Sequence, residues 1–121
     1  MADEKRSAIR VKKSLSIKYQ YALNTENRWD ISFVKDISEK GVCINTKVEF
    51  PVNGNIVLSF KLPTDPFHAI EINGRVIDSR LFGQTDTYVT RIEFTNLSIE
   101  QRTAIQQFVN WAISTEKPKK S

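Results

Sequence analysis

The chain of 121 residues is poor in the side chains that hold small proteins together through covalent bonds or metals. It has one cysteine, Cys43, and one histidine, His68. A single cysteine cannot form a disulfide within the chain, and this pair cannot supply the ligands of a zinc site. The free thiol fits a reducing compartment. Stability must therefore come from a hydrophobic core, which a chain of this length can build as one domain.

Long hydrophobic runs are missing as well. No apolar stretch approaches the roughly 18 residues that are needed to span a bilayer. The start of the chain, Met-Ala-Asp-Glu-Lys-Arg, lacks the apolar segment of a secretion signal. We therefore expect a cytoplasmic protein that does not insert into a membrane.

The groups that usually perform catalysis are scarce and scattered. Cys43 and His68 fall on different predicted elements, without the spacing of a known nucleophile and base. The acids Asp65, Asp78 and Asp86 stand in turns or at strand ends, where acidic residues are ordinary. The sequence therefore predicts no catalytic activity and no cofactor.

Positive charge gathers at the two ends of the chain. The formal net charge is +4, and residues 1–20 alone carry six lysines and arginines against Asp3 and Glu4. Three lysines among residues 117–120 make the other end basic too. A basic arm attracts phosphate groups. Basic ends are also common solubilising segments, so charge alone leaves both interpretations open.

Apolar and polar residues alternate along most of the chain, which predicts half-buried β-strands. The apolar sets are Val11, Leu15, Ile17, Tyr19 and Tyr21; Trp29, Ile31 and Phe33; Val42, Ile44 and Val48; Ile56, Leu58, Phe60 and Leu62; Ile70, Ile72, Val76 and Ile77; and Tyr88, Ile92 and Phe94. Alternation places Cys43 on the face opposite Val42 and Ile44. About six short strands indicate a small antiparallel barrel or sandwich.

Asn73-Gly74 interrupts the fifth apolar set and fits two structures. Asn-Gly between apolar runs is a strong hairpin signal. The same dipeptide can form a bulge that bends one long strand. We favour the bulge, because a closing barrel needs such a corner.

The hydrophobic period changes after residue 97. Ser98-Ile99-Glu100-Gln101 has the pattern of a capping box. Apolar residues then recur at the spacing of an amphipathic helix, at Ile105, Phe108, Val109 and Ala112. We therefore expect a basic arm over residues 1–10, a barrel over 11–96, a helix over 98–113 and a frayed tail over 114–121.

Two arginines, Arg6 and Arg10, stand four residues apart in the basic arm. In an extended segment they lie on one side, roughly 13 Å apart. A guanidinium donates from a planar fork that matches phosphate or the O6/N7 edge of guanine. One short segment can therefore hold two points of a compact dinucleotide, although a solvated basic arm explains the spacing equally well when it is taken alone.

A polar turn, Asp36-Ile37-Ser38-Glu39-Lys40-Gly41, follows between two predicted strands. Asp36 can accept hydrogen bonds from the Watson–Crick edge of guanine, and Ser38 can donate or accept. Gly41 permits a close backbone approach or a positive φ. These residue types are also common in hairpin turns that bind nothing.

Together and in this order, the two motifs resemble those of the PilZ family, bacterial receptors for cyclic di-GMP. The resemblance covers roughly residues 4–113. It implies a six-stranded antiparallel β-barrel with a C-terminal α-helix. It also implies that Arg6 and Arg10 hold phosphate and guanine, while Asp36, Ser38 and Gly41 surround a guanine base.

The resemblance carries further expectations about partners. Lys5 stands where a basic residue accompanies binding of two stacked ligand molecules in some members. Signalling would pass to an unidentified downstream protein, through ordering of the arm and a changed surface. One departure from the family pattern is the stretch Thr90-Arg91-Ile92-Glu93-Phe94, because many members have a glycine shortly before the phenylalanine of the last strand. Arg91 in this stretch could point to solvent, pair with a neighbour of Glu93 or reach the ligand, so we assign it no role from the sequence.

Two other functions compete with a cyclic di-GMP receptor. A small basic barrel could bind nucleic acid, but alternation assigns most aromatic residues to the core, so nucleic acid is the weaker interpretation. A PilZ-like adaptor without ligand is the other, and the presence of the motif residues argues against it.

Overall fold

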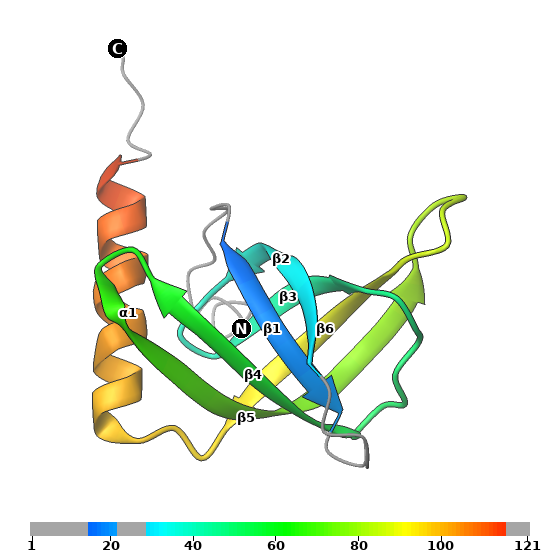
Figure 1. The fold of residues 1–121 in the computed structure, drawn as a ribbon, viewed down its shortest axis with the longest axis horizontal. Helices are drawn as coiled ribbons and strands as arrows, with labels where there is room; N and C mark the ends of the chain where they lie inside the picture. Colours follow the sequence, from blue (N-terminus) through cyan, green and yellow to red (C-terminus); the bar gives the residue numbers. More distant parts are fainter. Residues whose placement is uncertain (1–14, 22–28, 116–121) are drawn as a thin grey trace, which may run out of the picture.

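Six β-strands close into an antiparallel barrel in the computed structural model, which describes residues 15–21 and 29–115 (Figure 1). The strands are β1 (Ser16–Tyr21), β2 (Asp30–Ile37), β3 (Gly41–Thr46), β4 (Asn55–Leu62), β5 (Asp65–Leu81) and β6 (Tyr88–Thr95), and the helix is α1 (Ile99–Thr115). The order around the barrel is β1-β2-β3-β6-β5-β4. The fold class predicted from the sequence is confirmed, while the predicted arm and the start of the first predicted strand lie outside the described residues.

Strand β4 shows how alternation builds the core. Its apolar residues Ile56, Leu58, Phe60 and Leu62 are all buried in one cluster, and the residues between them are not. Burying each such side chain contributes about 1.5–3 kcal/mol. The strand ends at Leu62, immediately before Pro63, because proline lacks the N–H that would continue the ladder.

Strand β2 corrects the sequence analysis, because its alternation is shifted by one residue. Ile31 and Phe33 are 65% and 62% exposed, while Ser32 and Val34 face inward. The buried Ser32 hydroxyl donates to the carbonyl oxygen of Asn45 at 2.5 Å, so its burial costs little. A shift of one residue exchanges the two faces of a strand. Ile31 and Phe33 therefore do not join the core.

The third apolar set is also shorter than expected. Strand β3 ends at Thr46, and Val48 lies beyond it, exposed to solvent. The buried Thr46 hydroxyl shares a hydrogen bond of 2.8 Å with the Thr90 hydroxyl, which in turn contacts the Ser79 hydroxyl at 2.8 Å. This short polar chain replaces apolar packing at one end of the barrel.

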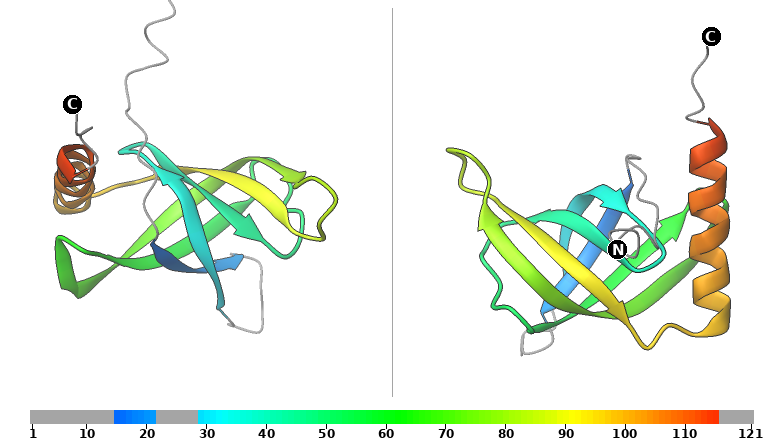
Figure 2. Two further views of the ribbon diagram at one scale, coloured as in Figure 1. Left: turned by 90° about the horizontal axis from the view of Figure 1, so that it is seen from above. Right: turned by 180° about the vertical axis from the view of Figure 1, so that it is seen from behind.

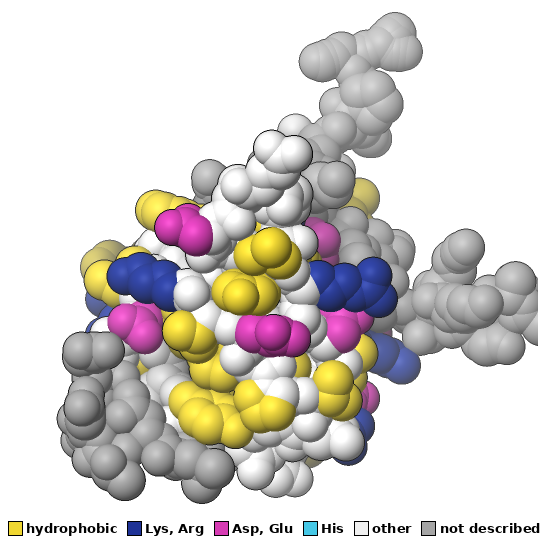
Figure 3. Space-filling view, turned by 90° about the vertical axis from the view of Figure 1, so that its right-hand side faces the viewer, with side chains coloured by type: hydrophobic (Ala, Val, Ile, Leu, Met, Phe, Trp, Pro, Cys, Tyr) yellow, Lys and Arg dark blue, Asp and Glu magenta, His cyan; other side chains and the backbone are white. Residues whose placement is uncertain are grey.

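Figure 3 shows hydrophobic side chains gathered between charged ones on one face of the molecule.

Strand β5 is continuous through Asn73-Gly74, as the long-strand interpretation predicts. Gly74 pairs with Ile56 of β4 and with Phe94 of β6. The register shift lies between Val76 and Asp78, so the bulge is beyond the Asn-Gly pair and not at it. Gly74 is needed for a different reason, because a Cβ there would come within 2.5 Å of the Ile92 side chain.

Helix α1 begins with the predicted capping box. The Gln101 N–H donates to Ser98 Oγ at 3.0 Å, and the Ser98 N–H donates to Gln101 Oε1 at 3.1 Å. The buried residues of the helix are the four of the predicted stripe, Ile105, Phe108, Val109 and Ala112. Figure 2 shows the helix standing beside the barrel, near the β4–β5 hairpin. No helix within the described ranges is both long and apolar enough to cross a membrane.

We predict that Phe108→Ala lowers the free energy of unfolding by about 3–5 kcal/mol, because it leaves a cavity where a fully buried ring anchors the helix. Ile99→Ala is the matched control on the same helix, where the side chain is 80% exposed. It should change the free energy of unfolding by less than about 0.5 kcal/mol. Urea unfolding measures both, and equal losses would contradict docking of α1 through its predicted stripe.

Candidate functional site

The turn between β2 and β3 is held in shape by its own serine. The Ser38 N–H donates to the Gly41 carbonyl oxygen at 2.9 Å, and the Lys40 N–H donates to Ser38 Oγ at 3.1 Å. Ser38 is buried. Its hydroxyl therefore organises the turn as an acceptor, and it retains one hydrogen of its own to donate.

Gly41 lies where the turn presses against β6. It pairs with Glu93, and a Cβ at this position would overlap the carbonyl oxygen of Ile92. The Lys40 carbonyl oxygen accepts from the Phe94 N–H at 2.9 Å and fixes the same contact. The sequence left open a close approach or a positive φ for Gly41. The structure selects the close approach, since Gly83 is the positive-φ glycine of the described residues.

Asp36 lies in a row of residues on the outer face of the barrel. A register shift after Val34 brings Asp36 opposite Cys43 of β3, Cys43 lies opposite Arg91 of β6, and Arg91 lies opposite Asp78 of β5. Cys43 is on the face opposite Val42 and Ile44, as predicted, although it is buried there. Neighbouring strands are about 4.8 Å apart. The row therefore connects the turn motif to charged residues of β5 and β6.

Those charged residues form two groups. Arg91 Nη1 and Arg80 Nη2 each lie 3.9 Å from the same oxygen of Asp78. Arg75 Nη2 lies 2.5 Å from Glu93 Oε1, and Glu93 is two residues beyond Arg91 on β6. The second group is electrically balanced, whereas two guanidinium groups share one carboxylate in the first.

An open hollow of about 180 Å³ lies between the turn and two of these residues, Arg91 and Glu93. It is lined by Lys40, Gly41, Ile77, Arg91, Ile92 and Glu93. Sequence reasoning missed the place of Arg91 in it. The usable signal was the phase of β6, since inward-facing Ile92 requires its neighbour Arg91 to point outward.

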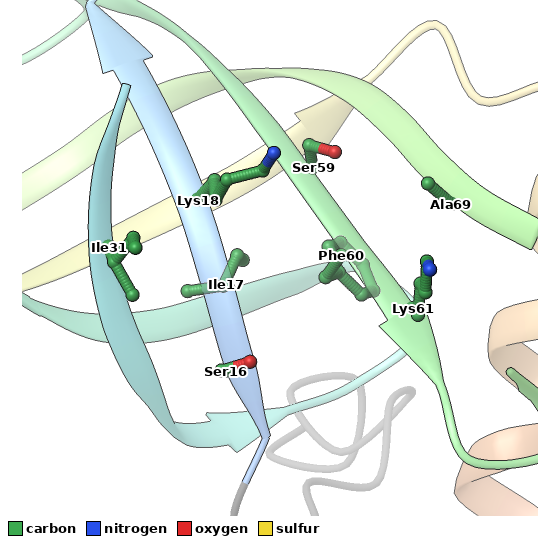
Figure 4. Close-up of a pocket in the computed structure, with 8 residues that line it drawn as sticks. All are labelled: Ser16, Ile17, Lys18, Ile31, Ser59, Phe60, Lys61 and Ala69. Atoms are coloured by element: carbon green, nitrogen blue, oxygen red, sulfur yellow. The ribbon is translucent and has the colours of Figure 1, made fainter. Parts of the chain in front are cut away.

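A larger hollow of about 310 Å³ lies elsewhere, where β1 and β4 meet (Figure 4). Its basic residues are Lys18 and Lys61, and it contains none of the predicted site residues. Strand β1 pairs with β4 only from Lys18 to Tyr21, so the two strands separate beside Ser16. We select the smaller hollow as the candidate site because Gly41, a predicted site residue, lines it.

The structure thus brings together part of the predicted site. Asp36 lies near the end of β2, Ser38 in the turn, and Gly41 at the start of β3. Lys5, Arg6 and Arg10 lie outside the described residues, so their approach to Asp36 stays a prediction. His68, set aside in the sequence analysis, pairs with Asp65 at 2.8 Å on the exposed β4–β5 hairpin. Across the two described ranges, no group of three His, Cys, Asp or Glu residues is placed to hold a metal ion.

Comparison with known proteins gives one family. The model of the PilZ domain matches residues 4–111. None of the curated proteins matches this chain.

Several solved structures share the fold. The Bacillus subtilis inhibitor of motility (MotI/DgrA) is 16% identical, with a TM-score of 0.75, over 96% of this chain and 53% of its own. MrkH of K. pneumonia in complex with c-di-GMP is 16% identical, with a TM-score of 0.75, over 95% of this chain and 55% of its own. The PilZ domain of Escherichia coli YcgR with c-di-GMP is 11% identical, with a TM-score of 0.62, over 93% of this chain and 97% of its own. The chain spans about half the length of the first two.

We predict that Gly41→Ala lowers the free energy of unfolding by about 1–3 kcal/mol, because the new methyl group meets a backbone oxygen that cannot rotate away. Lys40→Ala in the same turn is the control, since it removes an exposed side chain and leaves both backbone hydrogen bonds. It should stay within about 0.5 kcal/mol of the wild type. Thermal or urea unfolding measures the difference, and a fully stable Gly41→Ala variant would refute the steric explanation of this glycine.

Proposed function

The chain belongs to the PilZ domain family, and on that basis we propose that it is a receptor for cyclic di-GMP. It is proposed to act as a single non-catalytic domain, whose output is a changed surface for a downstream protein. The observation that carries the proposal is the β2–β3 turn. Asp36 stands there beside a serine and a glycine that are fixed against β6 by backbone contacts.

The turn offers the chemistry that a guanine base requires. Asp36 lies on the outer face, where its carboxylate can accept from the N–H groups of the Watson–Crick edge. Gly41 lines the hollow and lets the turn pack closely against the backbone of β6. We propose that Ser38 shapes the turn and donates its remaining hydrogen toward the ligand.

The basic arm supplies the opposing contacts in this proposal. Arg6 and Arg10 would close over phosphates and guanine edges with their planar forks, and Lys5 would add a third positive charge. Ordering the arm costs roughly 1–2 kcal/mol per residue, so the charge-assisted contacts must exceed that sum. Lys5 also supports the proposal that two stacked ligand molecules bind per chain.

Replacement of Arg10 by Ala should weaken cyclic di-GMP binding by about 2–5 kcal/mol, because it removes one partner of a desolvated charge pair. This corresponds to a loss of affinity of roughly 30-fold or more. Isothermal titration of both proteins measures it. Lys61→Ala is the control, because it removes one positive charge beside the other hollow, and it should leave the affinity within about twofold. An unchanged Arg10→Ala affinity would refute the role given to this arginine.

Ligand should also order the arm. We expect backbone ¹⁵N order parameters of residues 4–10 to rise from below about 0.6 in the free protein toward about 0.85 with cyclic di-GMP. Residues of α1, which pack on the core, serve as the internal control and should keep their values. Equal order parameters for the arm in both states would exclude closure.

A further inference from the structure

Arg91 points outward beside the turn motif. Asp36 of β2 lies opposite Cys43 of β3, and Cys43 lies opposite Arg91 of β6. Cys43 therefore separates Arg91 from Asp36 in this row. Two strand spacings put the backbones of Asp36 and Arg91 roughly 10 Å apart. That gap is suited to a purine ring that is contacted from two sides by side chains of this length.

The guanidinium of Arg91 is held loosely. Its side chain is 52% exposed, and its ion-pair distance to Asp78 is 3.9 Å, which is longer than a hydrogen bond. Asp78 is shared with Arg80 at the same distance, so the trio keeps one positive charge in excess. The Arg91 guanidinium is half exposed and its charge is incompletely neutralised, so it can still donate hydrogen bonds to an anionic or acceptor-rich partner.

Arg91 lines the hollow that we propose as part of the ligand site. It does so together with Lys40 and Gly41, both from the turn. Gly41 forms part of the wall of the hollow and packs against the β6 backbone, where a Cβ would overlap the carbonyl oxygen of Ile92. Lys40, which is exposed, adds a second cation at the rim.

We propose that Arg91 is a further ligand-binding residue of this site. It donates its fork to a pair of acceptors on the bound dinucleotide, which are either two phosphate oxygens or O6 and N7 of guanine. The inference rests on the proposed function and extends it. It assigns a role to Arg91, to which the sequence alone assigned none.

Isothermal titration of the full chain with cyclic di-GMP tests the inference. Arg91→Ala should weaken binding by about 10-fold or more, because a bidentate contact is lost. Arg91→Lys keeps the charge without the fork and should lose less than Arg91→Ala. It also covers the case in which the alanine variant does not fold, because a loss of affinity in the folded lysine variant still supports the inference.

Arg80→Ala is the matched control. It removes the same charge from the same carboxylate partner, on a side chain that is 79% exposed and does not line the hollow. Its affinity should stay within about twofold of the wild type. Wild-type affinity in both Arg91 variants, or equal losses in Arg80→Ala and Arg91→Ala, would overturn the inference. Absence of binding by the wild type would instead overturn the receptor proposal itself.

A second ligand identifies the contacted group. Cyclic GMP–AMP keeps both phosphates and exchanges one guanine for adenine, which lacks the O6 acceptor. If Arg91 contacts phosphate, Arg91→Ala should weaken both ligands by the same factor. If it contacts guanine, the variant should lose part of the wild-type preference for cyclic di-GMP.

Discussion

The candidate site depends on the contact of the β2–β3 turn with β6. The Lys40 carbonyl oxygen bonds the Phe94 N–H, and Gly41 lies so close to Ile92 that no side chain fits there. This contact closes the barrel at the turn and sets the register that brings Asp36 into one row with Arg91. A change in the contact would therefore alter both the fold and the proposed ligand site.

Ser38 and Gly41 consequently have structural tasks in addition to any contact with a ligand. The serine hydroxyl accepts a backbone hydrogen bond within the turn, and the glycine allows two chains to meet. A side chain that points to solvent, such as that of Arg91, carries no comparable task in the core. This difference separates the residues that build the turn from Arg91, for which we propose a contact with the ligand.

The sequence predicted what depends on local patterns and failed where distant contacts decide. The alternation of β4 and the Ser98–Gln101 capping box are local, and both were predicted. The phase of β2 depends on a hydrogen bond from Ser32 to Asn45 of the next strand, which periodicity does not reveal. The position of the β5 bulge depends on the pairing of β5 with β6, and the place of Arg91 depends on the pairing of β6 with β3 and β5. Asp36, Ser38 and Gly41 were found as a motif, but their separate tasks required the structure.

The burial of Cys43 has a practical consequence for spectroscopy. Alkylating reagents attack an accessible thiolate, and this sulfur is enclosed on β3 with only 6% of the residue exposed. The sequence contains no other cysteine. A fluorophore or spin label can therefore be attached to a cysteine introduced on the surface while the natural one remains in place and unmodified in the native state.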